Sequence, residues 1–424
     1  MKIKDWIKNK NELTKTKYHK DALEITEAAY DAIDTDNAIR TSMKIHGNIL
    51  NVNDHSFDLN DYENIYLVGC GKVACQAAKT IEEIFDNRIK KGVAIGIRES
   101  KCNAIDTYVG SHPIPSQVNL DASQDIIKIG DLVTENDLVV AVIGGGGSSL
   151  LCSSDEECQQ SQKLYDAFLR SGGDIGELNT VRRHISDLKG GGLAKYLYPA
   201  TIVSLIFSDV PGDDCSVVAS GPTYKDVSTI QNAQDIIDKY NLGSFDLLET
   251  PKDDKYFEKV TNIVLVSNHN AVDAMQAKSI ELGYQTNKFS CQIYDFPKEI
   301  CSKLQNEIND NTVVLAGGET KLIVPDNCEG LSGRNSMLAL EMLDHIKENQ
   351  IFISFASDGH DNGEAAGAII DSNTKKELEQ MGLDIEKYKR CLDSFTIFKK
   401  SNNLIFTGKV EANVSDLMIL LKWQ

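Results

Sequence analysis

Short apolar runs rich in β-branched residues alternate with stretches of helical periodicity along most of this chain, and this alternation restricts the fold more than any other feature. In the first half the apolar runs occupy residues 65–68, 93–97, 138–143 and 202–207. Helical patterns lie between them, at about 74–85 and 119–133. Continuous apolar runs separated by helices are typical of parallel strands that are covered on both faces. We therefore predict an α/β fold built on a doubly wound parallel sheet.

The second half repeats the pattern, with apolar runs at 263–266, 312–316, 351–355 and 404–406. A polar stretch, residues 224–259, separates the two series, and helical segments within residues 19–46 precede the first. A chain of 424 residues has room for two domains of ordinary size. We predict two α/β domains, residues 1–245 and 246–424, with a cleft between them.

The composition excludes several classes of partner. The chain carries 44 Lys and Arg residues against 63 Asp and Glu residues, a formal charge of −19, without a long basic block, which argues against nucleic acid or an anionic membrane. No apolar stretch suits a transmembrane helix or a secretory signal. The 10 cysteines include no CxxC pair, so neither a zinc site nor a disulfide framework is expected. We therefore expect a cytoplasmic protein with reduced thiols that acts on a small molecule.

Two glycine-rich loops follow predicted strands of the first half. Gly69, Gly71 and Lys72 lie in GCGKVA, which fits the G-x-G-x-x-[GA] pattern of loops that bring backbone N–H groups to a phosphate. A tight turn without a ligand explains these glycines nearly as well, but such a turn does not require a lysine. The second loop has four consecutive glycines and two serines, which favour a phosphate nest over a flexible hinge. Its candidate ligand-binding residues are Gly145, Gly146, Gly147, Ser148 and Ser149.

Residues 179–189 contain the densest basic cluster of the chain. Arg182, Arg183, His184 and Lys189 lie close in sequence to Asn179 and to a glycine triplet. Charge runs of this kind usually form a solvated helix face. The adjoining asparagine and glycines favour the alternative, in which the cluster binds an anion.

Carboxylates follow a further strand, in the segment SDVPGDD. Asp209, Asp213 and Asp214 are compatible with a simple turn cluster, with a Mg²⁺ site, or with a base that acts on a hydroxyl. In the second half, glycines again accompany charged residues at strand ends, namely Glu319, Arg334 and Asp358. Glycines, cations and carboxylates at strand ends are what phosphoryl transfer requires. Neither a Walker loop nor the protein-kinase motifs are present.

Nine segments in collinear order resemble the class II glycerate 2-kinases, whose second half is called the MOFRL domain. They are VGCGKVA, GSHPIPS, IGGGGSSLL, LNTVRRHISDLKGGGLA, SDVPGDDCSVVASGPT, VSNHNAVDAM, LAGGET, SGRNSMLALE and SDGHDNGEAAGAIID. The resemblance runs from about residue 20 to the C-terminus. It implies a Rossmann-like domain beside a smaller α/β domain, with the active site between them. It also implies phosphorylation of D-glycerate to 2-phosphoglycerate, with ATP as donor and Mg²⁺ as cofactor.

The resemblance assigns roles to three residues. The proposed catalytic lysine of the family falls on Lys72, the carboxylate of its SDVPGDD loop on Asp209, and the arginine of its GGRN segment on Arg334. As hypotheses, Asp209 positions the attacking hydroxyl or takes its proton, whereas Lys72 and Arg334 neutralise the phosphoryl group or the substrate carboxylate. The other candidate residues would hold the remaining charge of ATP and a glycerate-like hydroxyacid. Association into a homodimer is left open.

Two other functions remain open. An NAD(P)-dependent reductase of hydroxypyruvate or another short hydroxyacid would use the Gly69–Ala74 loop and Glu99, although Lys72 is unexpected in a pyrophosphate loop. A binding module for an anionic metabolite would explain the cations and glycines but would leave the aspartate cluster without a task. Binding and turnover of Mg-ATP, compared with binding of NADH, separate the three functions.

Overall fold

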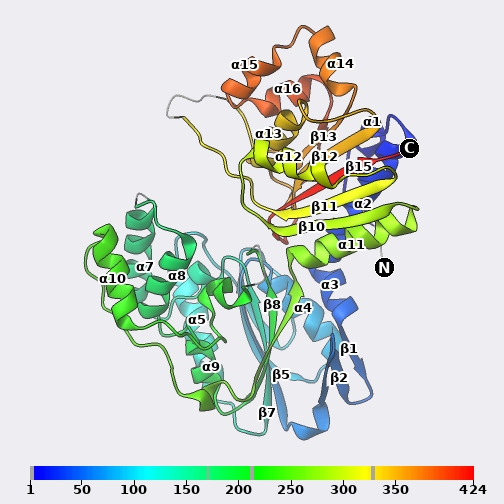
Figure 1. Cartoon of the computed structure of the whole chain (residues 1–424). Helices are drawn as coiled ribbons and strands as arrows, with labels where there is room; N and C mark the ends of the chain where they lie inside the picture. Colours follow the sequence, from blue (N-terminus) through cyan, green and yellow to red (C-terminus); the bar gives the residue numbers. More distant parts are fainter. Residues whose placement is uncertain (1–3, 170, 211–213, 326–329) are drawn as a thin grey trace. The chain divides into compact units, whose positions relative to one another are not determined.

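The chain folds into two compact units, shown in the computed structural model of Figure 1, which describes residues 4–169, 171–210, 214–325 and 330–424. One unit, here the parallel-sheet unit, comprises Ala38–Ser208 and Asp214–Leu265. The other, the mixed-sheet unit, comprises the chain up to Asn37, a short segment that starts at Asp209, and Val266–Gln424.

A parallel sheet forms the centre of the parallel-sheet unit. Its strands are β4 (Asn64–Cys70), β5 (Ile89–Gly96), β6 (Ile105–Val109), β7 (Asp137–Gly144), β8 (Thr201–Phe207) and β9 (Val260–Val266). Among the described residues the sheet has six strands in the order β6-β5-β4-β7-β8-β9, and β4 pairs in parallel with β5 and β7. Every residue of β7 is buried, as its continuous apolar run predicts. The predicted doubly wound sheet is confirmed.

Helices accompany this sheet, and all except the first of them lie between its strands in the chain. They are α3 (Thr35–Ser42), α4 (Ala74–Phe85), α5 (Gln117–Gly130), α6 (Gly147–Leu150), α7 (Asp155–Phe168), α8 (Ile175–His184), α9 (Gly192–Leu197) and α10 (Ile230–Tyr240). Short strands β1 (Met43–His46), β2 (Ile49–Val52) and β3 (His55–Asp58) form a separate antiparallel sheet. The 3-10 helices are η1 (Leu59–Asp61), η2 (Cys215–Ser220) and η3 (Asp254–Tyr256). The helices predicted near 74–85 and 119–133 are α4 and α5, which both pack on β5.

The second sheet differs from the first in the direction of its strands. They are β10 (Gln285–Ile293), β11 (Thr312–Gly318), β12 (Gln350–Ala356), β13 (Gly367–Asp371), β14 (Leu404–Ile405) and β15 (Asp416–Lys422). Within the described chain their order is β10-β11-β15-β12-β13-β14. β15 lies between β11 and β12 and is antiparallel to both, whereas β10 and β11 are parallel. The sequence pattern had not marked β15 as a strand, because its place depends on partners far away in the sequence.

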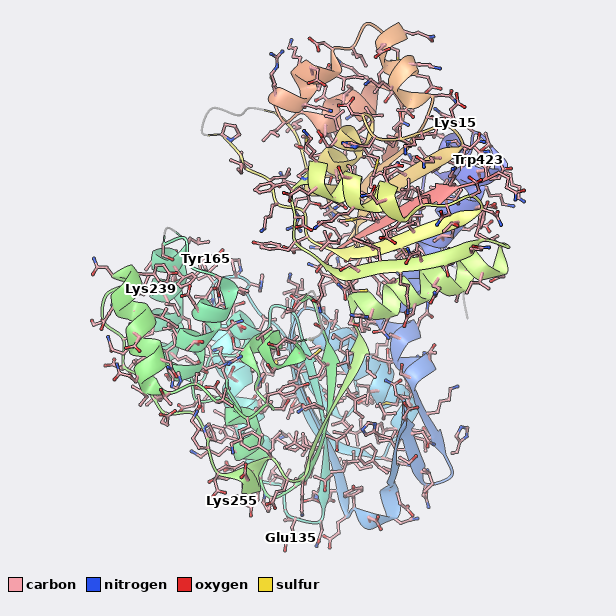
Figure 2. All side chains as sticks on the ribbon, in the orientation of Figure 1. Lys15, Glu135, Tyr165, Lys239, Lys255 and Trp423 are labelled. Carbon is pink, nitrogen blue, oxygen red and sulfur yellow. A yellow bond between two sulfur atoms is a disulfide. The ribbon has the colours of Figure 1, made fainter. Side chains whose placement is uncertain are left out.

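The N-terminal helices belong to the mixed-sheet unit. Its helices are α1 (Lys10–Leu13), α2 (Lys17–Ile33), α11 (Asn268–Glu281), α12 (Pro297–Glu307), α13 (Arg334–Met342), α14 (Thr374–Gln380), α15 (Ile385–Arg390) and α16 (Ser394–Lys400). On α2, the Tyr30 hydroxyl donates to the Ala356 carbonyl at 2.9 Å. Tyr18 stacks on Trp423, labelled in Figure 2, with ring centroids 4.2 Å apart. The division therefore differs from the predicted boundary near 245, because an amphipathic pattern does not reveal which sheet a helix will cover.

One pair of cysteines differs from the expectation of reduced thiols. Cys152 and Cys158 form a disulfide, with their Cα atoms 5.6 Å apart. The turn between α6 and α7 brings the two residues together, which their spacing in the sequence did not indicate. In the part of the chain that the structure describes, no helix is long and apolar enough to cross a membrane.

Candidate active site

The loops that follow β4 and β7 touch each other. The Lys72 N–H donates to the Gly145 carbonyl, with nitrogen and oxygen 2.9 Å apart. Gly71 has a φ of +129°, and a Cβ atom placed there would lie 2.6 Å from the Gly144 Cα. The backbones can approach this closely only because position 71 has no side chain. Parallel pairing of β4 with β7 places the ends of both strands at the same edge, which explains why the two predicted loops meet.

Two side chains flank Gly146 in the glycine loop. A Cβ atom on Gly146, whose φ is +79°, would lie 3.0 Å from Cδ2 of His112 and 3.1 Å from Cγ of Lys72. Lys72 is half-buried and His112 is exposed. Partial desolvation lowers the pKa of His112, and the positive charges of Lys72 and Arg182 lower it further. His112 was not among the predicted site residues, although it lies in the GSHPIPS segment.

A chain of hydrogen bonds joins the glycine loop to α8. The hydroxyl oxygens of Ser148 and Ser220 are 2.9 Å apart, and Ser220 donates to the Asn179 side-chain oxygen at 3.1 Å. Arg182 Nη1 donates to the same oxygen at 3.4 Å. Burial lowers the pKa of the Arg182 guanidinium, so an anion bound beside it would stabilise its charge. The structure thus brings four predicted side chains together, namely Lys72, Ser148, Asn179 and Arg182. Ser149 lies in the same loop and donates to the Gly146 carbonyl at 3.1 Å.

Two other members of the predicted basic cluster have partners inside the fold. His184 is fully buried, and its Nδ1 lies 2.8 Å from the Leu248 carbonyl oxygen. Arg183 Nη1 donates to Asp226 at 2.9 Å. These two side chains are used in internal contacts, whereas the sequence had suggested that they face a ligand.

Lys189 forms a buried ion pair. It is 1% exposed, and its Nζ donates to Glu157 at 2.6 Å and to the Leu151 carbonyl at 3.0 Å. Burial alone would raise the pKa of Glu157, but Lys189 and the surrounding donors hold it below its usual value. Of the dense basic run in the sequence, Arg182 is therefore the member that hydrogen bonds connect, through Asn179 and Ser220, to Ser148 of the glycine loop.

A second candidate site lies in the mixed-sheet unit. A cavity of about 320 Å³ is lined by Arg334, Ala356, Asp358, His360, Asp361, Asn362, Asn413, Ser415 and Asp416. Arg334 Nη1 is 3.0 Å from Glu319, and Arg334 Nε is 3.0 Å from Asp416. Arg334, Asp358 and Glu319 were predicted from their strand-end positions, and the structure places them in or beside this one cavity.

Asp416 is the charged residue that the sequence did not reveal. It is 3% exposed, and its Oδ1 accepts a hydrogen bond from Asn335 at 2.7 Å. Burial raises the pKa of this carboxyl to about 7, although Arg334 and Asn335 oppose the rise. Asp416 begins β15 and is in register with the last residues of β11 and β12, which brings it to the strand end that carries Glu319.

Asp361 holds the first turn of α13, the helix that carries Arg334. Its carboxylate accepts from the Asn335 N–H at 2.9 Å and from the Ser336 N–H at 2.8 Å. A Cβ atom on Gly333 would lie 2.1 Å from the Asp361 Cγ, so only glycine allows this approach. Burial raises the pKa of Asp361 despite these hydrogen bonds. Asp361 therefore caps the N-terminus of α13 and fixes the orientation of the helix turn from which the Arg334 side chain extends.

The predicted aspartate cluster is only partly described. The Asp209 carbonyl accepts from the Ser415 hydroxyl at 3.3 Å, which places Asp209 beside a residue of the cavity wall. The Asp214 carboxylate accepts from the Ser216 N–H at 3.2 Å and caps η2. Asp213 lies outside the described residues. Among the residues described, no three His, Cys, Asp or Glu side chains gather as a metal site.

Two family models match the chain. One, described as a domain of unknown function (DUF4147), matches residues 21–250, and the other, the MOFRL family, matches residues 312–416. A D-glycerate 2-kinase from Thermotoga maritima is 33% identical over 423 residues, which cover 94% of this chain and 97% of that protein. The chain belongs to the class II glycerate 2-kinase family.

The similarity to this family extends to the fold. A crystal structure of a glycerate kinase from Thermotoga maritima has a TM-score of 0.84 and 31% identity, and covers 95% of this chain and 99% of its own. A putative hydroxypyruvate reductase from Agrobacterium vitis is 31% identical over 84% of this chain and 98% of that protein. The match to the glycerate kinase structure therefore spans both units of the chain.

Proposed function

We propose that this chain transfers the γ-phosphoryl group of Mg-ATP to D-glycerate and forms 2-phosphoglycerate. One observation carries the proposal, namely that Lys72 lies against a four-glycine loop. The backbone N–H of Lys72 donates to the Gly145 carbonyl at 2.9 Å, and the stem of the Lys72 side chain lies beside Gly146. Glycine-rich backbone and a lysine are groups that bind phosphoryl oxygens in phosphotransferases. The relatives named glycerate 2-kinases suggest the acceptor.

Three residues would act on the reacting groups. The C2 hydroxyl oxygen of glycerate would attack the γ-phosphorus, the bond from that phosphorus to the bridging oxygen would break, and ADP would leave. Asp209 would position the hydroxyl or take its proton, while Lys72 and Arg334 would neutralise the phosphoryl oxygens or the glycerate carboxylate. Arg334 already contacts two carboxylates. A proton on Asp416 would leave more of the Arg334 charge available to a ligand.

The remaining predicted residues would bind ATP and glycerate. Those that we retain in this role are Gly69, Gly71, Gly145, Gly146, Gly147, Ser148, Ser149, Asn179, Arg182, Glu319 and Asp358. Mg²⁺ commonly uses one or two carboxylates together with substrate phosphates, and Asp209 and Asp214 carry oxygen donors of that kind. When bound, Mg²⁺ would neutralise part of the phosphate charge.

Turnover with a panel of three- and four-carbon hydroxyacids tests the proposal. ATP consumption should saturate with D-glycerate, fall steeply when Mg²⁺ is withheld, and give a product whose phosphate NMR assigns to C2. Lys72→Ala and Asp209→Ala should each lower kcat by at least about 100-fold without loss of folding. Lys79→Ala, an exposed lysine on α4, is the control and should turn over normally. Near-normal turnover of either site variant would contradict the role assigned to it.

A reductase is the second candidate function, because one relative carries that name. Glu99 lies shortly after β5, the strand next to β4, where a ribose-binding acid could lie. Saturable NADH binding and NADH-dependent reduction of hydroxypyruvate, without ATP turnover, would favour the reductase over the kinase.

A further inference from the structure

His112 lies at the glycine loop without a role in the mechanism described above. It belongs to the segment between β6 and α5, and the Cδ2–Nε2 edge of its ring faces Gly146. A Cβ atom on Gly146 would lie 3.1 Å from the His112 Nε2 and equally close to the Lys72 Cγ. The imidazole edge and the lysine stem thus flank the same glycine, and His112 is exposed to solvent.

A buried asparagine attaches this segment to the glycine loop. Asn119, the third residue of α5, is fully buried, and its side-chain oxygen accepts from the Ser111 N–H at 2.9 Å and from the Ser116 N–H at 3.1 Å. Its side-chain nitrogen donates to the Ser111 carbonyl at 3.0 Å and to the Ser149 carbonyl at 3.1 Å. One amide group therefore binds both sides of the His112 segment and the end of the glycine loop.

The charges around His112 favour a neutral donor. Lys72 and Arg182 already contribute two cations near the ring, and a third would be repelled by them. A neutral imidazole with a proton on one ring nitrogen still donates a hydrogen bond to an anion. A neutral imidazole can therefore give the anion a directional hydrogen bond without placing a third positive charge beside Lys72 and Arg182.

We propose that His112 binds an anionic oxygen of a substrate at the Gly145–Gly147 backbone through a ring N–H, and that Asn119 is the positioning residue for it. This inference rests on the proposed kinase function. The oxygen belongs either to an ATP phosphate or to the glycerate carboxylate, and the two sources are distinguished by which substrate's KM changes.

Steady-state kinetics of three variants test the role of His112. His112→Ala should lower kcat/KM by about 10- to 100-fold, as expected for loss of a hydrogen bond to a charged group. A raised KM for ATP alone would assign the oxygen to the nucleotide, and a raised KM for glycerate alone would assign it to the acceptor. His112→Gln, whose amide also offers an N–H, should recover much of the loss. His46→Ala, an exposed histidine on β1, is the control.

The role of Asn119 is tested by coupling. Asn119→Asp keeps the acceptor but removes the N–H donors to the Ser111 and Ser149 carbonyls, so it should raise the same KM as His112→Ala. The double variant should lose less than the product of the two single losses. If Asn119→Asp does not fold, Ser116→Ala removes a milder contact, the 3.0 Å bond from the Ser116 hydroxyl to Asn119, and should show the same selective change in KM.

A binding measurement separates failure of this inference from failure of the proposed function. The ring NMR signals of His112 should shift when ATP or D-glycerate is added to the wild-type chain, even if no turnover occurs. Unshifted signals at saturating ligand, or kcat/KM of His112→Ala within about twofold of an active wild type, would overturn the role of His112. A wild type that binds both ligands but consumes no ATP would instead contradict the kinase proposal.

Discussion

Replacement of Asp416 by asparagine should change how the stability of the mixed-sheet unit depends on pH. The pKa of this buried carboxyl is raised from 3.8 to about 7 in the folded chain, chiefly by burial. Between these two pH values the unfolded chain has released its proton while the folded chain still holds it. The free energy of unfolding therefore falls as pH rises through this window, and the contribution is lost above the folded pKa.

The magnitude follows from the size of the rise. Each pKa unit corresponds to about 1.4 kcal/mol, so the ionised side chain costs the folded state about 4 kcal/mol above pH 7. Asp416→Asn removes the titration but keeps an oxygen that can accept from Asn335. The variant should gain about 2 kcal/mol relative to wild type between pH 5.5 and pH 7.5.

Urea unfolding followed by tryptophan fluorescence provides the assay. Both tryptophans of the chain lie in the mixed-sheet unit, where Trp6 stacks on Tyr30 and Trp423 stacks on Tyr18. The fluorescence signal therefore reports on the unit that contains Asp416. Asp5→Asn, at an exposed position of the same unit, is the control and should keep a constant offset from wild type. An equally constant offset for Asp416→Asn from pH 5.5 to 7.5 would refute the reasoning.

Three further substitutions test other parts of the structure. Gly146→Ala should lower kcat/KM by more than tenfold, because the Cβ atom of the alanine would press on His112 and Lys72. Gly172→Ala is the control, since Gly172 has a similar φ of +75° but no atom within 4 Å of the added Cβ. This variant should lose only about 1–2 kcal/mol of stability to backbone strain and should keep wild-type kinetics. Lys189→Met should lower the free energy of unfolding in urea by about 3–5 kcal/mol, because it leaves the Glu157 carboxylate buried and unpaired, and a change below about 1 kcal/mol would show that the ion pair is unimportant. Gly333→Ala should shift the helix that carries Arg334, because its Cβ would overlap Asp361, and an unchanged thermal midpoint would contradict that account.

Much of the parallel-sheet unit could be predicted from the sequence. Its strands are continuous apolar runs and its loops are marked by glycines, and both are local signals. The glycine pattern predicts loops at Gly71 and at Gly145, but it does not predict that the two loops touch. The contact itself follows from parallel pairing, since strands that run in the same direction end at the same edge.

The charged residues were predicted less well, because their roles depend on partners that are distant in the sequence. Lys189 and Arg182 belong to one basic run, yet one is paired in the core with Glu157 and the other is near the glycine loop. Nothing in the spacing of the two distinguishes them. Burial and the position of the partner decide which charge remains available to a ligand.

The sequence by itself determined the α/β class and the positions of the glycine loops, because periodicity and turn chemistry are encoded over a few neighbouring residues. Membership in a kinase family was indicated separately, by the resemblance of nine collinear segments to that family. Only the tertiary structure decided that β15 enters the centre of the mixed sheet and brings Asp416 to Arg334, 82 positions earlier in the chain. It also decided that α2 covers that sheet and that Asn119 attaches the His112 segment to the glycine loop. Strand order, ion pairs and the pKa of a buried carboxyl depend on contacts between distant segments, and these arise only when the whole core has formed.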